Sequence, residues 1–213
     1  MGVEHRIELG PPRDLVEAAK AVMGAIDFDP FSTKDINRLV QAARFLDRDR
    51  VAEPEIALEN VLAPDWDLPG EKRAFIAPAH GAQWSRKLIN KTLREYQRGR
   101  VDQAVIWVAN NETLTKVPWV WNFPVCIPFK RLRATWYDDE LDKFRNTVPA
   151  SWSSVVYLPP SDPQRFHSKV SLFHASFFTM GAIIFNEMSG HTDWEKAYEL
   201  GMKKKYNYYK TEF

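Results

Sequence analysis

Apolar side chains recur every three or four positions in several segments of the chain, a spacing typical of amphipathic helices. These segments cover residues 13–23, 34–43, 83–97, 162–173 and 193–210. Gly24 and Gly99 lie just after two of them, where glycine suits a helix end. Ser32 or Thr33 can cap the second segment, because a hydroxyl oxygen accepts a hydrogen bond from a free backbone N–H of the first turn.

Short apolar runs between these segments predict strands. They cover residues 25–28, 74–77, 103–109, 152–158 and 182–185. The run at 103–109 is almost continuously apolar, as expected of a central strand covered on both faces. Asp29-Pro30 is expected to end the first strand, because proline cannot donate to a sheet ladder. The alternation of helices and strands predicts an α/β fold with helices on both faces of a sheet.

The length favours one main domain. We expect this domain to cover residues 1–186 and a short helical extension to cover residues 187–213, since the last part of the chain is polar and helical in pattern. The extension ends in a lysine run and three tyrosines, and no linker strong enough to divide the rest is visible.

The charge and cysteine content restrict the chemistry. The formal net charge is +1, so a DNA-binding face would have to be a local cluster of basic residues. Cys126 is the only cysteine, which excludes an intramolecular disulfide and fits a reducing compartment. Its apolar neighbours predict a buried, unreactive thiol.

Other classes of site find no support in the sequence. No apolar run approaches the roughly 20 residues of a membrane span, and the charged N-terminus does not resemble a signal peptide, so we expect a cytoplasmic protein without membrane contact. The five histidines show no metal-ligand spacing, and we expect no metal. A Ser-His-Asp arrangement and a G-x-G-x-x-G fingerprint are also absent.

Two predicted strand ends carry the candidate chemistry. Asp27 and Asp29 are expected at the end of one strand, and Ala77-Pro78-Ala79-His80 follow another. Ligands of open α/β sheets bind beyond the carboxyl ends of the strands. A carboxylate there can accept hydrogen bonds from an amine or a ribose, although helix capping and turn formation are the simpler alternative for both aspartates.

An ordered series of segments resembles a known family. The segments are residues 11–16, 24–33, 37–45, 75–81, 95–101, 108–113 and 130–133, with Trp66 between the third and the fourth. Together they span most of the chain, and the series resembles the phage-type DNA N-6-adenine methyltransferases. The resemblance implies a Rossmann-like methyltransferase sheet, S-adenosylmethionine (SAM) as cofactor, DNA as partner and, for a phage-encoded protein, the host cytoplasm as its location.

The resemblance also shows a departure at the catalytic position. Where the family has Asn/Asp-Pro-Pro-Tyr, this chain has Ala77-Pro78-Ala79-His80. In the family the Asn or Asp side chain and the next carbonyl accept hydrogen bonds from the adenine amine, and the aromatic ring stacks on the flipped base. Ala77 cannot accept such a bond, and losing one preorganised polar contact typically costs about 2.7–4 kcal/mol. Pro78 keeps its carbonyl, and His80 keeps a smaller flat ring.

Three functions therefore stay open. The chain can be a degenerate methyltransferase that binds SAM or DNA without turnover. It can remain a methyltransferase whose acceptor comes from Asp29, Asn110 or Asn111. It can also have a pocket retuned for another nucleophile, with His80 as general base. The alternative from another class is a catalytically inactive binding protein with a regulatory or assembly role.

By resemblance, one set of residues is assigned to the cofactor and another to DNA. The cofactor set is Pro12, Asp27, Asp29, Pro30 and Asn110. The DNA set is Arg98, Arg100, Lys130, Arg131 and Arg133. The first two arginines follow a helix end, and the other three cations precede Trp136 and Tyr137, so phosphates and unpaired bases could both find partners. A solvated face is the simpler alternative for each cluster.

Overall fold

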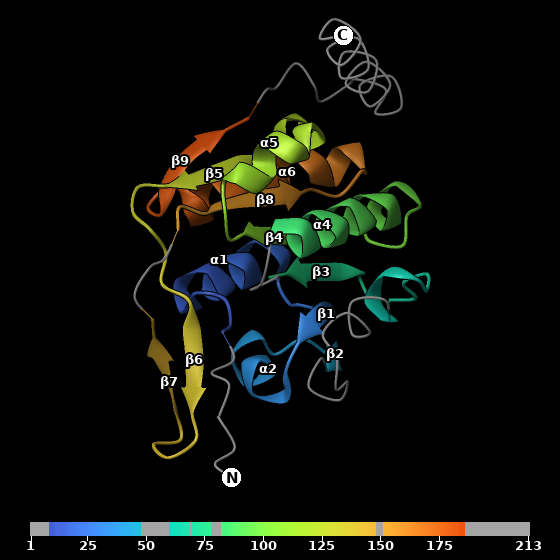
Figure 1. Ribbon diagram of the computed structural model, residues 1–213. Coiled ribbons are helices and arrows are strands. Elements are labelled where there is room, and N and C mark those ends of the chain that lie inside the picture. Colours follow the sequence, from blue (N-terminus) through green and yellow to red (C-terminus); the bar gives the residue numbers. More distant parts are fainter. Residues whose placement is uncertain (1–8, 48–59, 69, 78–81, 148–150, 186–213) are drawn as a thin grey trace, which may run out of the picture.

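The structure is a computed structural model, and it describes residues 9–47, 60–68, 70–77, 82–147 and 151–185 (Figure 1). The helices are α1 (Arg13–Met23), α2 (Lys34–Val40), α4 (Ala82–Gln97), α5 (Glu112–Lys116), α6 (Pro163–Phe177) and the 3-10 helix η2 (Pro118–Asn122). The strands are β1 (Phe28–Ser32), β2 (Arg44–Asp47), β3 (Arg73–Ile76), β4 (Gln103–Val108), β5 (Val125–Pro128), β6 (Thr135–Asp138), β7 (Lys143–Asn146), β8 (Ser154–Leu158) and β9 (Gly181–Ile184). The extension predicted over residues 187–213 lies outside the described residues, as do Pro78, Ala79 and His80.

Seven strands form one mixed sheet in the order β2-β1-β3-β4-β8-β5-β9. The first four are parallel to one another. β8 is antiparallel to both β4 and β5, so β5 points the same way as β4. β9 pairs antiparallel with β5 at the edge, and β6 and β7 form a separate hairpin. The predicted α/β class is confirmed.

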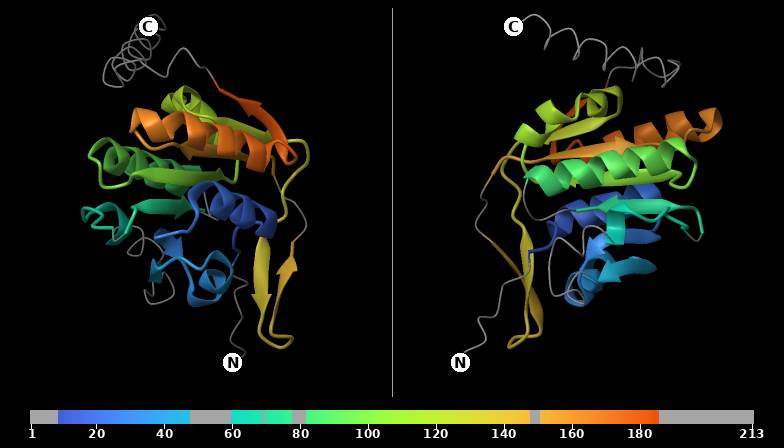
Figure 2. Two further views of the ribbon diagram at one scale, coloured as in Figure 1. Left: turned by 180° about the vertical axis from the view of Figure 1, so that it is seen from behind. Right: turned by 45° about the vertical axis from the view of Figure 1, so that its right-hand side comes forward.

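Helices cover both faces of the sheet. Side chains of β4 alternate between two cores, with Ile106 on the face of α4 and α5, and Val105 on the face of α1, α2 and α6. Figure 2 shows α1 and α6 from behind, on the side opposite α4. A strand that contributes to two cores needs apolar residues at successive positions, which explains the apolar run of β4.

The start of β1 differs from the prediction. The strand expected over residues 25–28 begins at Phe28 and runs through Pro30 to Ser32. Its pairing with β2 shifts register between Asp29 and Ser32, and such an irregularity accommodates a residue that lacks an N–H. Asp27 therefore precedes the strand, and the prediction that it lies at the strand's end was wrong.

The last strand also differs from the prediction. The run at 182–185 was expected to be a buried strand, but β9 lies at the edge of the sheet and pairs only with β5. Ala182 and Ile184 are exposed. Apolar composition alone does not distinguish a central strand from an edge strand, because both pair through backbone groups.

The close approach of Gly181 to β5 can be tested by substitution. A Cβ atom at this position would overlap the backbone carbonyl of Ile127, which cannot move without disturbing β5. We expect Gly181→Ala to lower the free energy of unfolding by about 1–3 kcal/mol, the usual cost of overpacking. Urea denaturation measures it, with Ala182→Ser at the neighbouring exposed position as the control. Equal stability of the two variants would contradict this packing.

The burial of the Cys126 thiol can be tested by chemical labelling. Its side chain is buried in β5, as predicted, and burial raises the pKa of its thiol to about 12. At about pH 8, only about one thiol in 10,000 would then be ionised. We expect iodoacetamide to label the folded protein at least about a thousandfold more slowly than the protein in denaturant. Comparable labelling rates in both states would show an accessible thiol.

Candidate functional site

The candidate site is the edge of the sheet where the parallel strands end. The arrowheads of β3 and β5 point to this edge, on the left in Figure 1. β8 runs in the opposite direction, so its first residues lie at the same edge. β1 pairs with β2 on one side and with β3 on the other, although both strands follow it in the chain. The junction between β1 and β3 is therefore a topological switch point, which is the usual position of a ligand in open α/β sheets.

β1 and β3 are direct neighbours, paired through Phe28 and Ala74. Asp29, the second residue of β1, is buried, and its Oδ1 accepts the backbone N–H of Phe31 at 3.0 Å. Pro30 follows it inside the strand. Ala77 directly follows β3 and is buried. The structure therefore brings the acidic strand and the strand that leads to the predicted catalytic turn side by side.

Asp27 lies at the opposite edge of the sheet. Its two carboxylate oxygens accept hydrogen bonds from Nε and Nη2 of Arg73, both at 2.9 Å, and Oδ2 also accepts the Arg73 backbone N–H at 2.9 Å. Burial opposes ionisation, but these contacts lower the pKa of Asp27 overall. This ion pair joins the start of β1 to the start of β3, so Asp27 does not join the candidate site.

Pro12 lies at the N-terminus of α1. Since α1 ends where β1 begins, its N-terminal end points to the carboxyl edge of the sheet. Gly10 pairs with Thr135 of the hairpin through hydrogen bonds of 2.7 and 3.1 Å, and the Thr135 hydroxyl donates to the carbonyl of Pro11 at 2.8 Å. The hairpin thus holds the segment before α1 beside the site.

Asn110 and Asn111 follow β4 at the same edge. The side chain of Asn110 is exposed, and its Oδ1 accepts the N–H of Glu112 at 3.0 Å, which closes the turn into α5. Asn111 instead bonds to the start of β8: its N–H donates to the carbonyl of Trp152 at 3.0 Å, and its Oδ1 accepts the Ser154 hydroxyl at 2.7 Å. The side-chain oxygen of Asn110 thus forms a turn, whereas that of Asn111 joins β4 to β8.

Two buried polar atoms at the carboxyl edge were not singled out from the sequence. The indole N–H of Trp107 and the hydroxyl of Ser153 have no hydrogen-bond partner within the described part of the chain. Trp107 packs in the same core as Ala77 and pairs with Val155, two residues after Ser153. Buried donors are rarely left unpaired, so these two mark a place where a polar ligand could bind.

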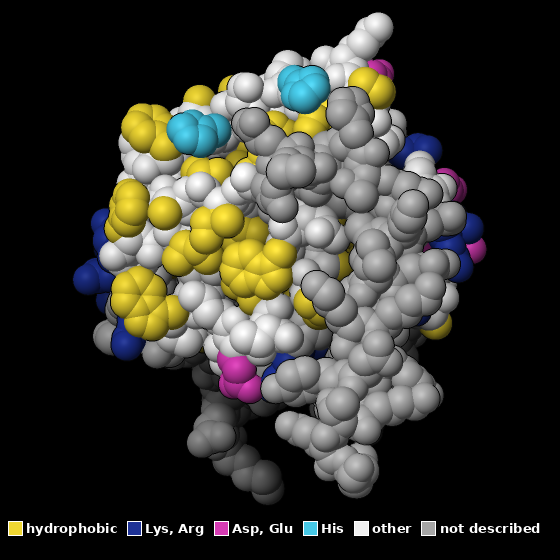
Figure 3. All heavy atoms as spheres, turned by 90° about the horizontal axis from the view of Figure 1, so that it is seen from above, with side chains coloured by type: hydrophobic (Ala, Val, Ile, Leu, Met, Phe, Trp, Pro, Cys, Tyr) yellow, Lys and Arg dark blue, Asp and Glu magenta, His cyan; other side chains and the backbone are white. Residues whose placement is uncertain are grey.

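The cations at 130–133 follow β5 at the carboxyl edge. In Figure 3, Lys and Arg side chains lie at the left and right rims of the face seen from above. Their aromatic neighbour is not the one expected. The Arg131 guanidinium lies 5.8 Å from the ring centroid of Trp152, whereas Trp136 faces Arg145 at 5.9 Å. Trp136 lies in the hairpin and faces Arg145 there, and the start of β8 brings Trp152 to Arg131.

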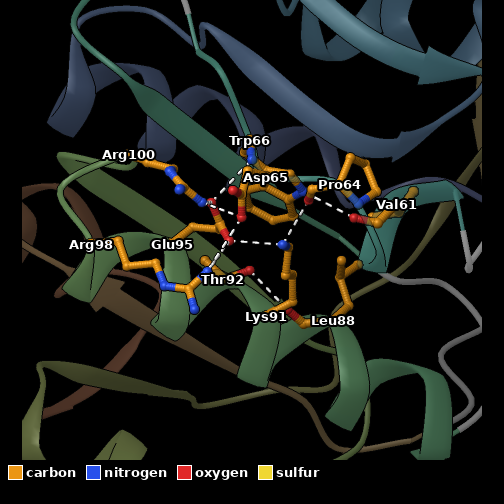
Figure 4. A network of polar contacts seen from close by, with 10 residues as sticks. All are labelled: Val61, Pro64, Asp65, Trp66, Leu88, Lys91, Thr92, Glu95, Arg98 and Arg100. Atoms are coloured by element: carbon orange, nitrogen blue, oxygen red, sulfur yellow. Dashed lines mark hydrogen bonds and ion pairs between the residues drawn. The ribbon is translucent and has the colours of Figure 1, made fainter.

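Arg98 and Arg100 lie at the other edge, after the end of α4. Figure 4 shows both converging on Asp65 and Glu95. Glu95 also pairs with Lys91 at 2.8 Å and accepts the backbone N–H of Trp66 at 3.0 Å. This network holds the loop before β3 against α4, so the two basic clusters do not form one DNA face.

The network keeps Trp66 in the core. The ring of Trp66 packs edge-on against Phe28 of β1 at 5.2 Å, and its indole N–H donates to the carbonyl of Val61 at 3.0 Å. Burial disfavours the Glu95 carboxylate, but its hydrogen bonds to Lys91, Trp66 and Arg100 lower the pKa of Glu95 overall. Trp66 and Glu95 therefore support β1 from the face of α4.

No family model, curated protein or solved structure matches the chain. Within the described ranges, no helix is long and apolar enough to cross a membrane, and no group of three His, Cys, Asp or Glu side chains could hold a metal ion. The geometry of the site is thus the basis for a proposed function.

Replacing Glu95 tests the network. Glu95→Gln removes the carboxylate that pairs with the buried Lys91, and we expect the free energy of unfolding at neutral pH to fall by about 3–5 kcal/mol. Because the folded-state pKa of Glu95 lies below its ordinary 4.5, the difference from wild type persists above that pH and shrinks as the pH falls below it. Urea denaturation across this range measures it. Glu112→Gln, in the exposed pair with Lys116, is the control and should change little.

Proposed function

We propose that this chain is a homologue of the phage-type DNA adenine methyltransferases that binds SAM and DNA at the carboxyl edge of its sheet. The observation that carries the proposal is the direct pairing of β1, which contains Asp29, with β3, which leads into Ala77. The sequence resemblance assigns the cofactor to the first strand and the reacting base to the second. Their adjacency at a switch point supports both assignments.

The direction of the strands also supports the proposal. β8 is an antiparallel strand inserted between β4 and β5, which are parallel to each other. The described sheet thus keeps four neighbouring parallel strands, β2, β1, β3 and β4, and such a mixed α/β sheet is compatible with the Rossmann-like methyltransferase sheet that the resemblance implies. The chain also lacks the glycine fingerprint of the dinucleotide fold.

The described residues fit SAM by their chemistry. Asp29 provides a carboxylate for a ribose or an amine, and Trp107 and Ser153 provide buried donors that need partners. When bound, SAM supplies an electrophilic methyl group on its sulfonium. The protein must hold the adenine amine in line with it and accept hydrogen bonds from that amine, since its lone pair is otherwise delocalised into the ring.

Ala77 favours a second candidate, a catalytically inactive protein with the same fold that only binds. Its methyl group is buried at the end of β3 and offers no hydrogen-bond acceptor. Asn110 is exposed at the end of a nearby strand, but its Oδ1 already closes a turn. The two candidates differ in turnover and agree in binding, so separate experiments are needed for each.

Calorimetric titration with SAM tests the cofactor site. We expect the wild-type protein to bind SAM, and Asp29→Asn to weaken binding by roughly 10- to 150-fold, the value of one hydrogen bond to a charged group. The substitution keeps an oxygen for the Phe31 N–H. Asp67→Asn, at an exposed position, is the control. A wild-type protein that binds no SAM would overturn the cofactor assignment.

Restoring the family's tetrapeptide tests catalysis. We expect the triple variant Ala77→Asn, Ala79→Pro, His80→Tyr to methylate adenine in DNA about 100- to 1,000-fold faster than wild type, because it regains a preorganised acceptor. Transfer of labelled methyl groups from SAM measures this rate. Adding Asp29→Asn should abolish the gain. A folded, SAM-binding triple variant without activity would favour the binding-only candidate.

A further inference from the structure

Trp152 has a fixed backbone at the carboxyl edge and an exposed ring. Its carbonyl accepts the N–H of Asn111, and on either side Ser151 and Ser154 donate their hydroxyls to Ala109 and Asn111 at 2.6 and 2.7 Å. These bonds join the start of β8 to the end of β4. The side chain is nevertheless 47% exposed. Because its backbone is already fixed, Trp152 loses little further conformational entropy when a flat ligand binds to its exposed ring.

The segment between β5 and β6 lies beside Trp152. Its first residue, Phe129, donates its N–H to the carbonyl of Met180 at 3.0 Å, and Leu132 packs against the core. Between these two anchors, Arg131 places its guanidinium by the Trp152 ring. Phe129 itself is 68% exposed. The edge thus presents two aromatic side chains and a guanidinium on anchored backbone.

The three cations of this segment have no counter-charge among the described residues. Lys130, Arg131 and Arg133 are exposed and form no ion pair with any described residue. Several other arginines differ, since Arg73, Arg98, Arg100, Arg145 and Arg165 each pair with a carboxylate. With a net charge of only +1, the chain has no general positive surface, so these unpaired cations are a local site for anionic groups.

We propose that Trp152, Phe129, Lys130, Arg131 and Arg133 form a binding site for unpaired nucleotides of single-stranded DNA. Base faces stack on exposed aromatic rings, and cations contact the phosphates between them. In a duplex the faces of each base are covered by its neighbours, so the exposed rings favour unpaired strands. The inference deepens the proposed function and rests on it for the choice of DNA as the nucleic acid.

Fluorescence anisotropy with labelled oligo(dT) tests the stacking. We expect wild type to bind the single strand more tightly than the same strand annealed to oligo(dA). Trp152→Ala should weaken binding by about 5- to 150-fold, the effect of losing one stacked base. Trp152→Phe, which keeps a flat ring, should retain most of the affinity. Trp121→Ala, at another exposed tryptophan on η2, is the matched control and should change it less than about twofold.

The salt dependence of the same binding tests the cations. For single strands, the logarithm of the association constant falls with the logarithm of the salt concentration by about 0.7 per phosphate contact. We expect the double variant Lys130→Ala, Arg133→Ala to reduce this slope by about 1.4. Arg165→Ala, which removes an arginine already paired with Asp102, should leave the slope unchanged.

The outcomes separate this site from methyl transfer. The nucleotide site is overturned if oligo(dT) does not bind, if it binds equally as a duplex and as a single strand, or if neither Trp152 variant changes its binding. This conclusion holds whether or not the protein binds SAM. Binding through Trp152 in a protein that does not bind SAM overturns the proposed methyltransferase function and supports the nucleotide site. Circular dichroism of each variant confirms that a loss of binding reflects the side chain rather than the fold.

Discussion

The antiparallel pairing of β8 with β4 is the constraint on which the site depends. Five residue pairs join the two strands, from Ala104–Leu158 to Val108–Ser154. Because β8 runs opposite to its neighbour, its first residues meet the carboxyl ends of the parallel strands. A parallel strand at this position would carry Ser153 and Trp152 to the other edge. The buried donors and the exposed ring therefore reach the site through the direction of one strand.

The two basic clusters, at opposite edges of the sheet, differ in how their charges are compensated. At the amino edge, Asp27 pairs with Arg73 and Asp102 with Arg165, and Arg100 joins Glu95. At the carboxyl edge, the cations after β5 have no such partners within the described residues. Paired charges hold elements together, whereas unpaired cations remain available to an anionic ligand. This asymmetry separates two basic clusters that look alike in the sequence.

Much of the architecture could be predicted because it follows from local patterns. The α1 and α4 helices and the β4 strand have apolar spacing that leaves little choice of element. β2 was missed, since none of its four residues is fully buried and they gain their strand conformation from pairing with β1. The shift of β1 was missed for a related reason: a register irregularity beside Pro30 depends on the neighbouring strand and not on the segment itself.

The sequence by itself determined the α/β class, the buried cysteine and the residues that follow each strand, because side-chain spacing and chain order encode them. Only the tertiary structure decided which strand ends are neighbours, since pairing joins residues far apart in the chain. It separated Asp27 from Asp29, although they are two residues apart. It also joined Arg131 to Trp152 and removed Arg98 and Arg100 from the same face. Contacts of this kind depend on strand order and direction, which no local pattern specifies.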